Sequence, residues 1–530
     1  MIAIIINENL VDLDFINKHT VDFEKIKKSF STIPIREYIE KSNLDYELVR
    51  QVTIGFAKSK KACVRVDLGI QQSIHSTLNS YLEKLLFIVT GNFGKEGANN
   101  LHTQLVPIVG HSDEPENGGK TTKVTGMKEI GNFFPPNILP AEIDNEHSDR
   151  IRALIVDSAN PILTAADSKA YIKAFKKLDL LVVIDVANTE TAKMADYVLP
   201  TQSQFEKWEA AFFTLDFPTN YFQLRKPIVK ALGNTLSEPE IYKRLLVAMN
   251  LFPKKLSFLE FMAKIHSRFP SFGLFPVALK IYLILFPKLK KSILIVLYET
   301  LGKTLKDGAR NAVMLWGVSH IYAKKYRKAV LRTGLKGKGF KLGEALFKKI
   351  IDNKSGLVIS KHKFDEVWEL VKTKDKKIHL YIPEMITALK DLKTEKLNTD
   401  IFPFILAAGE RRMYNANQIY RDPNWRKKDR EGALRIHPND AIKIGVLNDN
   451  YALIKSEKHQ IKVKIEYDNA MNLGFVSLPH GYGFDYIDAE KPTKIMQNGP
   501  KINMLTSSEN CDPITKTPYH KYVPVSIESI

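Results

Sequence analysis

The sequence predicts an α/β fold with a doubly wound parallel sheet, a basic, mostly helical insertion and a C-terminal β-barrel. Three observations lead to this fold class. Continuous apolar runs at 151–157 and 180–185 alternate with helical patterns, which is typical of a parallel sheet covered on both faces. Residues 251–350 are strongly basic and carry apolar residues at helical spacing. After residue 402, short alternating strands are broken by Asn, Asp and Gly turns, which favours a compact barrel.

Composition limits the class of protein. With 530 residues, 44% of them hydrophobic and 26% charged, the chain is too apolar to be disordered and long enough for roughly three to four domains. Two cysteines, Cys63 and Cys511, exclude a disulfide framework or a four-thiolate metal or iron–sulfur site built from this chain alone, and they favour a reducing, cytoplasmic location. We expect no secretory signal, because no positive charge precedes the short apolar run at the N-terminus and the stretch has no small-residue cleavage site. We expect no transmembrane segment, because lysines and prolines interrupt the apolar stretch 272–301.

The net charge of +19 is concentrated in one block. Residues 251–350 hold 21 Lys and Arg against 4 Asp and Glu, a net of +17, which leaves +2 for the other 430 residues. Such a block could bind RNA, an acidic lipid surface or an acidic protein. The favoured interpretation is that the lysines solvate the outer faces of amphipathic helices, and no nucleic-acid partner is expected.

The remaining elements follow in order along the chain. We expect a helix at 37–56, a strand at 62–68 that would bury Cys63, and a long helix at 75–90 that stops at Gly91. Residues 101–150 are irregular. Helices are expected at 168–178 and 190–195, a third short strand at 197–199, and barrel strands at 451–456, 460–467 and 475–478. These patterns divide the chain into segments 1–100, 101–250, 251–400 and 401–530.

Polar residues follow the two apolar strands where ligands of an open parallel sheet bind. Asp185 ends one strand and could accept two hydrogen bonds from the edge of a guanine. Asn160, Thr189 and Thr191 could bind ribose or phosphate oxygens. The alternative interpretation is that these residues cap helices and turns. The sequence has neither a GxGxxG nor a GxxxxGK[ST] motif to support nucleotide binding.

Four ordered groups of motifs carry a family resemblance. The first two are IINENLVDLDFINKHT at 5–20 and LLFIVTGNFGKEG at 85–97. The third is Asn160-Pro161, Asp185, Thr189, Thr191-Ala192, Ala195-Asp196, Leu199-Pro200 and Glu206. The fourth comprises 438–450, 477–483, NMLT at 503–506 and DPITKTPYHK at 512–521. Together they closely resemble the molybdopterin oxidoreductase family (the dimethyl-sulfoxide-reductase superfamily), formate-dehydrogenase-like branch, whose C-terminal part is a dinucleotide-binding barrel.

The resemblance implies a two-electron oxidation or reduction at a molybdenum or tungsten atom held by two molybdopterin guanine dinucleotides. It implies that Asp185 contacts a guanine, that Asn503 and the loop 409–417 contact the pterin, and that two glycines allow close backbone approach. The residues expected to bind the cofactor are Gly94, Gly97, Asn160, Asp185, Thr189, Thr191, Arg411, Asn415, Asn417, Asn503 and Lys521. His102, His480 and His520 are further candidate polar contacts.

The resemblance covers the C-terminal portion of the family. Family members carry a cysteine cluster for an iron–sulfur centre and a Cys, selenocysteine, Ser or Asp ligand to the metal, both upstream of the part that residues 5–20 resemble. We therefore expect no catalytic residue and no metal ligand in this chain, and an iron–sulfur cluster only in a separate N-terminal segment. The expected function is the cofactor-binding part of a molybdenum-dependent oxidoreductase, incomplete without an upstream chain or segment.

The expected partners are that upstream segment, a small-molecule substrate and a redox partner subunit. A truncated, inactive product is one alternative. The other is a relict structural or interaction protein that uses the basic block 251–350.

Overall fold

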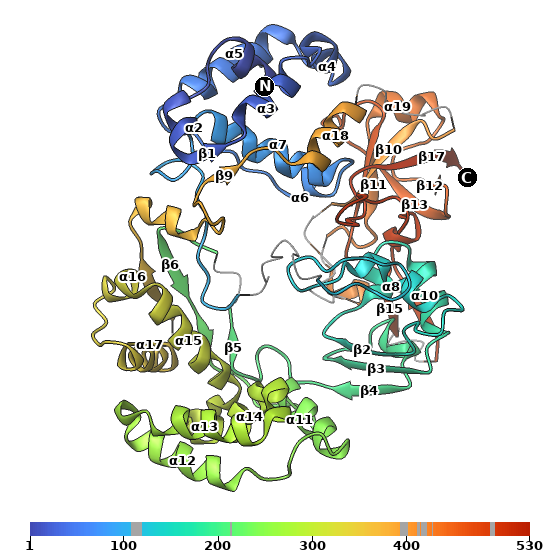
Figure 1. Cartoon of the computed structure of the whole chain (residues 1–530). Coiled ribbons are helices and arrows are strands. Elements are labelled where there is room, and N and C mark those ends of the chain that lie inside the picture. The colour runs from blue at the N-terminus through green and yellow to red at the C-terminus, as the bar shows by residue number, and fades with distance from the viewer. Residues whose placement is uncertain are drawn as a thin grey trace.

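The computed structural model (Figure 1) describes residues 1–107, 119–211, 215–353, 355–392, 401–410, 414, 421–426, 428–487 and 493–530. The N-terminal helices lie beside the barrel, the parallel sheet lies below the barrel, and the helices of the basic insertion lie at the opposite end of the molecule. Each of these parts has its own buried apolar cluster. The mixed α/β fold with a parallel sheet and a C-terminal barrel confirms the predicted fold class.

The N-terminal part is a helical body. Its helices are α1 (Ile2–Asn7), α2 (Leu13–His19), α3 (Phe23–Phe30), α4 (Ile35–Lys41), α5 (Tyr46–Lys58), α6 (Leu68–Gln71) and α7 (Ser76–Val89). The long helix predicted at 75–90 is α7, which ends just before Gly91 at φ +63°. The helix predicted at 37–56 is split into α4 and α5, because Asp45 caps a new helix by accepting the N–H of Leu48 at 2.7 Å.

The strand predicted at 62–68 is wrong. The backbone N–H of Ala62 donates to the side chain of Asn92 at 3.1 Å, and that of Val64 donates to Asn99 at 2.8 Å. Side-chain amides thus satisfy the groups that a neighbouring strand would have paired. Cys63 is exposed rather than buried.

A later segment returns to the N-terminal body. Strand β9 (Ile378–His379) pairs in parallel with β1 (Thr20–Val21), and α18 (Pro383–Asp391) contributes Met385 to the same apolar cluster. The division of the chain at residues 100, 250 and 400 stays a prediction.

The parallel sheet has the order β2-β3-β4. Its strands are β2 (Ala153–Asp157), β3 (Leu180–Asp185) and β4 (Tyr197–Pro200), with α8 (Leu139–Ile143), α9 (Pro161–Thr164) and α10 (Ser168–Phe175) beside them. On one face Val183 packs with Tyr171 of α10 in a buried cluster. On the opposite face Ile155, Leu180 and Tyr197 are 48%, 38% and 64% exposed.

The basic insertion is mostly helical, as predicted. It comprises α12 (Ser257–Arg268), α13 (Leu274–Leu285), α14 (Ile293–Glu299), α15 (Met314–Lys325), α16 (Arg327–Leu331) and α17 (Phe340–Asp352), and α11 (Glu238–Ala248) precedes it. Short antiparallel pairs join it to the preceding segment: β5 (Glu209–Ala210) with β7 (Leu224–Arg225), and β6 (Thr219–Phe222) with β8 (Leu357–Lys361).

Glu344 on α17 is half-buried among these helices. Glu344 accepts hydrogen bonds from Trp316 Nε1 at 2.6 Å and from His320 Nε2 at 2.9 Å, and His266 Nε2 lies 3.3 Å away. Burial raises the pKa of Glu344, but these hydrogen bonds outweigh it and lower the pKa to about 2.

The C-terminal part is a closed barrel with the strand order β10-β14-β11-β13-β12-β17. The strands are β10 (Phe404–Glu410), β11 (Ala433–Ile436), β12 (Tyr451–Lys455), β13 (Gln460–Tyr467), β14 (Phe475–Pro479) and β17 (Val523–Ser529), with helix α19 (Pro438–Lys443). The strands predicted at 451–456, 460–467 and 475–478 correspond to β12, β13 and β14. Leu406, Leu434, Ile454 and Val525 are fully buried inside the barrel.

Within the described ranges, no helix is both long and apolar enough to cross a membrane.

Candidate cofactor-binding site

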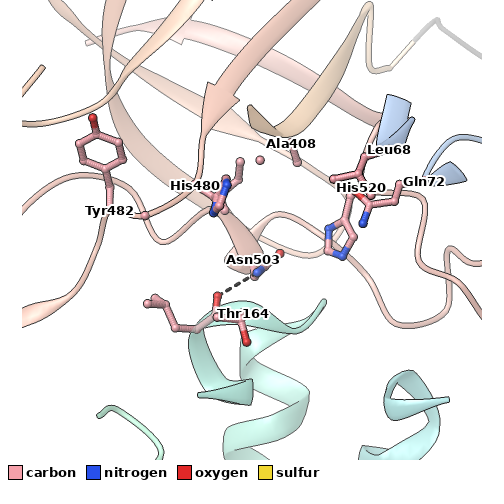
Figure 2. Close-up of a pocket in the computed structure, with 12 residues that line it drawn as sticks. Leu68, Gln72, Thr164, Ala408, His480, Tyr482, Asn503 and His520 are labelled. Carbon is pink, nitrogen blue, oxygen red and sulfur yellow. Dashed lines mark hydrogen bonds between the residues drawn. The ribbon is translucent and has the colours of Figure 1, made fainter. Parts of the chain in front are cut away.

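A cavity of about 180 Å³ lies where the barrel meets α9 and α6 (Figure 2). It is lined by Leu68, Gln72, Leu163, Thr164, Ala408, Gly409, His480, Gly481, Tyr482, Ile502, Asn503 and His520. Thr164 and His520 also line a groove of about 780 Å³, which runs along β2 and past residues 515–518. Together the two spaces have the size of a small-molecule or cofactor site, about 300–1,000 Å³.

Three polar side chains of the barrel part surround the cavity. His480, Asn503 and His520 lie around it in Figure 2. Asn503 Nδ2 donates to the carbonyl of Leu163 at 2.8 Å, which ties the barrel part to α9. Burial, helped by the charge of Lys521, lowers the pKa of His520 to about 4. His520 is therefore neutral at pH 7 and offers one donor and one acceptor nitrogen.

A glycine forms part of the cavity wall. Gly409 has φ +80°, and a Cβ built there would lie 3.7 Å from Lys521 Nζ and 3.9 Å from His480 Cβ. Lys521 Nζ donates to the carbonyl of Ala408 at 2.6 Å, so its ammonium group is held beside this wall. In the adjoining groove, the side-chain oxygen of Asn137 is buried and has no hydrogen-bond partner among the described residues.

These groups fit the polar end of a pterin. A pterin edge carries N–H donors and acceptor atoms, and the orphaned amide oxygen of Asn137, neutral His520 and cationic Lys521 can pair with both kinds. The side-chain-free backbone at Gly409 leaves room for a flat ring to approach.

The predicted guanine contact lies at the end of its strand. Asp185 is buried at the carboxyl end of β3, where one carboxylate oxygen accepts the N–H of Ala187 at 3.1 Å. Burial raises its pKa, opposed by the backbone N–H groups of Ala187 and Val186 and by the charge of Arg421. Thr189 is buried and accepts the N–H of Ala192 at 3.1 Å.

Asn160 and Thr191 are bonded to each other. The side-chain oxygen of Asn160 accepts the N–H of Thr191 at 3.2 Å and its hydroxyl at 2.8 Å. The amide nitrogen of Asn160 donates to Glu190 at 2.6 Å. The structure thus brings these predicted residues together at one edge of the sheet. The turn and capping contacts expected under the alternative interpretation are present. That these residues also bind a nucleotide stays a prediction.

Sequence reasoning missed the ion pair at this edge. Arg421 Nη1 donates to Glu190 at 2.8 Å, and the N–H of Asp485 donates to the same carboxylate at 2.9 Å. Burial raises the pKa of Glu190, but the hydrogen bonds and the charge of Arg421 lower it to about 2. The pair joins the sheet to the barrel part across 231 residues of sequence. Glu190 lies between the motif residues Thr189 and Thr191, whereas no local pattern indicates Arg421.

The other predicted residues are placed differently. Gly94 and Gly97 have φ +74° and +76°, but the atoms close to them belong to this chain's own Val367, Trp368 and Lys61. Neither glycine lines the cavity.

The remaining candidates have no described place in the site. Arg411, Asn415 and Asn417 lie outside the described residues, and His102 is exposed away from the cavity. In the part of the chain that the structure describes, no group of three His, Cys, Asp or Glu side chains is placed to hold a metal ion.

Comparison with known proteins identifies the family. A molybdopterin oxidoreductase model matches residues 43–247, and a molydopterin dinucleotide binding domain model matches residues 404–524. The chain belongs to the molybdopterin oxidoreductase family. The dinucleotide-binding match covers barrel strands β10 to β14 and the start of β17, and it includes the cavity residues His480, Asn503 and His520.

Relatives in this family include formate dehydrogenases. The F420-dependent formate dehydrogenase subunit alpha of Methanocaldococcus jannaschii is 31% identical over 263 residues, which is 46% of this chain and 37% of that protein. Formate dehydrogenase H of Escherichia coli is 26% identical over 229 residues, which is 40% of this chain and 32% of that protein. The match thus spans about a third of the length of these curated relatives.

A solved structure shares the fold. Acetylene hydratase from Pelobacter acetylenicus aligns with a TM-score of 0.64 at 17% identity, covering 100% of this chain and 69% of that one.

Proposed function

We propose that this chain is the cofactor-binding, C-terminal part of a molybdenum- or tungsten-dependent oxidoreductase of the formate-dehydrogenase type. The observation that carries the proposal is the cavity between the barrel and α9, which is lined by Gly409, His480, Asn503 and His520 and lies in a part of the chain that matches a dinucleotide-binding domain. When bound, two molybdopterin guanine dinucleotides and their metal would supply two-electron redox chemistry. Formate is the substrate class suggested by the relatives' names.

The chain's own residues would bind and orient the cofactor. Asn503, His520 and Lys521 would hold the pterin through hydrogen bonds and charge. Asp185 would accept N–H groups of the guanine with the carboxylate oxygen that does not cap Ala187. The sugar and phosphates would contact Asn160, Thr189 and Thr191, and Gly94, Gly97, Arg411, Asn415 and Asn417 complete the proposed set.

A second polypeptide segment would complete the enzyme. On the open face of the sheet, Ile155, Leu180 and Tyr197 are exposed, whereas parallel sheets are ordinarily covered on both faces. The relatives are longer than the region they share with this chain. We propose that a segment homologous to their unmatched part covers this face and supplies the iron–sulfur cluster and the metal ligand. A redox partner subunit would accept or deliver the electrons.

The thiols fit a reducing compartment. Cys63 is exposed, and Cys63 and Cys511 are both free. An exposed free thiol persists best where the surroundings are reducing, so we propose a cytoplasmic location.

Cofactor content tests the proposal. The chain is expressed in cells that make the cofactor, alone and together with the N-terminal segment of a formate dehydrogenase relative. Molybdenum, tungsten, pterin and the GMP released by acid are measured in each preparation. We expect guanine and pterin in the co-expressed pair. Their absence from that pair would refute the proposal and favour an inactive relict or a structural protein.

Matched variants test the guanine contact. Asp185→Ala removes the carboxylate at the carboxyl end of β3, and Asp179→Ala removes an exposed one just before the same strand. A hydrogen bond to a charged group contributes about 1.5–3 kcal/mol. The Asp185→Ala variant should therefore retain at most about one tenth of the guanine that the parent chain retains. Asp179→Ala should retain as much as the parent chain. Equal retention by both variants would show that Asp185 is a capping residue.

A further inference from the structure

Helices α12 and α13 expose an apolar surface, here called the hairpin patch. It consists of large apolar side chains that are each more than half exposed: Phe258, Phe261, Phe269, Phe272, Val277, Ile281, Ile284 and Leu285. Single exposed apolar residues are ordinary, but a contiguous group of this size marks an interaction surface. The two helices lie at the edge of the molecule farthest from the N-terminal helices and the barrel (Figure 1).

The patch is built by helical spacing. On α13, Val277, Ile281 and Ile284 lie four and seven residues apart, which places them on one face. The opposite face of the same helix contributes Phe275 and Leu279 to the buried cluster of the insertion. The exposed stripe is therefore separate from the face of α13 that packs against the core of the insertion.

Aromatic contacts connect the two helices. The ring of Phe258 on α12 stacks 6.4 Å from that of Tyr282 on α13, and Tyr282 lies 4.6 Å from the ring of Phe286. At the turn between the helices, the rings of Phe269 and Phe272 lie 6.0 Å apart. Tyr282 itself packs against the buried cluster of the insertion, so its contact with Phe258 holds α12 and α13 side by side and places the exposed Phe258 next to α13.

The segment that carries the patch is strongly positive. Residues 251–291 contain eight Lys and Arg but one acidic residue, Glu260, which pairs with Lys303 outside this segment. The eight are Lys254, Lys255, Lys264, Arg268, Lys280, Lys288, Lys290 and Lys291. Within the described residues, none of them has an ion-pair partner. A partner that binds this surface should therefore be negatively charged.

We propose that the hairpin patch binds the surface of an anionic phospholipid membrane. Exposed aliphatic and aromatic side chains rimmed by lysines are the composition of helices that lie in the plane of a bilayer interface. With 12 residues, α13 is about 18 Å long, shorter than the roughly 30 Å of a bilayer's hydrocarbon core. The helix therefore lies on the membrane and does not span it. A nucleic acid would contact the lysines but leave Ile281, Ile284 and Leu285 in water.

Such an attachment is compatible with cofactor binding. None of the hairpin residues lines the cavity beneath the barrel or the adjoining groove. The membrane would hold the chain by the insertion and leave the cofactor-binding parts accessible to other subunits. The inference does not depend on the cofactor being bound.

Vesicle binding by the full chain tests this inference. The purified protein is sedimented with phosphatidylcholine vesicles and with vesicles that also contain phosphatidylglycerol, at low and high salt. We expect binding to the anionic vesicles that weakens as salt rises. Ile284→Asp should weaken this binding about tenfold or more, because it removes an inserted apolar side chain. Lys288→Gln with Lys291→Gln should weaken it roughly 25-fold, at about fivefold per lysine.

Matched controls separate the patch from general surface properties. Ile442→Asp changes an equally exposed isoleucine on α19, and Lys58→Gln with Lys60→Gln changes exposed lysines at the end of α5. These controls should bind vesicles as the parent chain does, and thermal melting should show that each variant is folded.

Three results would overturn the inference. The first is no binding to anionic vesicles, and the second is equal binding by patch and control variants. The third is binding lost in the lysine variants but unchanged in Ile284→Asp, which would indicate a purely electrostatic polyanion surface.

Discussion

The buried Glu190–Arg421 pair gives a prediction whose size follows from the structure. Lowering the pKa of Glu190 from 4.5 to about 2 corresponds to roughly 3 kcal/mol of preference for the charged form in the folded state. Its side chain is 5% exposed and that of Arg421 18%, so solvent screens the pair weakly. Removing one partner of a buried pair typically costs about 3–5 kcal/mol.

The perturbation is Glu190→Gln, which keeps the shape and removes the charge. We expect the free energy of unfolding at pH 7 to fall by about 3 kcal/mol. The assay is urea denaturation, with hydrogen exchange at 160–191 and 421–426 to locate the loss. Glu509→Gln, which removes one partner of an exposed pair with Lys458, is the control and should cost less than about 1 kcal/mol.

The pH dependence provides an independent check. Because the folded pKa of Glu190 is depressed, its stabilisation is present above about pH 4.5 and is lost as the pH falls toward 2. Glu190→Gln should therefore show a shallower loss of stability over that range than the parent chain. If Glu190→Gln costs no more than Glu509→Gln, or if the acid profiles coincide, the pair does not join the sheet to the barrel as argued.

Three further predictions concern other parts of the fold. Leu406→Ala, in the fully buried barrel core, should cost about 2–5 kcal/mol in urea unfolding, and a loss below that range would mean that the barrel is loosely packed. Glu344→Gln should reduce stability at pH 7 but remove part of its loss between pH 4.5 and 2, because the pKa of Glu344 is lowered to about 2; acid titration followed by circular dichroism measures this. Gly409→Ala should reduce pterin content, read by fluorescence after release, because the methyl group enters the cavity. Gly445→Ala is its control, since it has a similar φ but open space around it, and equal pterin content in both would place the pterin elsewhere.

Sequence patterns correctly predicted the strands whose formation depends on their own residues. The run 180–185 consists of two leucines, three β-branched residues and a final Asp, and β3 has those bounds. In β12 and β13, buried and less buried residues alternate and turn residues follow each strand, so their positions could also be predicted. Strand β14 does not alternate, since four of its five residues are buried. The segment 62–68 has a similar alternation, but the amides of Asn92 and Asn99 bind its backbone instead. Nothing in residues 62–68 themselves indicates those partners.

The candidate site also combines residues that the local sequence indicates with residues that only distant contacts place. The turn residues Asn160, Asp185 and Thr191 could be found because strand ends are recognisable and the motif is compact. Arg421 could not, because its partner Glu190 lies 231 residues away. The polarity of His480 and His520 was visible in the sequence, but their convergence on one cavity depends on how the barrel closes.

The closure of the barrel has a consequence for synthesis. Strand β17 pairs with β10 on one side and β12 on the other, with Val525 opposite Phe404 and Ile527 opposite Ile454. On the ribosome, both of those neighbours emerge long before residues 523–529. Until then, the nascent chain presents two unsatisfied strand edges to other polypeptides, which is a known route to aggregation. Chaperone dependence during translation should therefore centre on this interval, and a stall placed between residues 467 and 523 should yield an unclosed, protease-sensitive barrel.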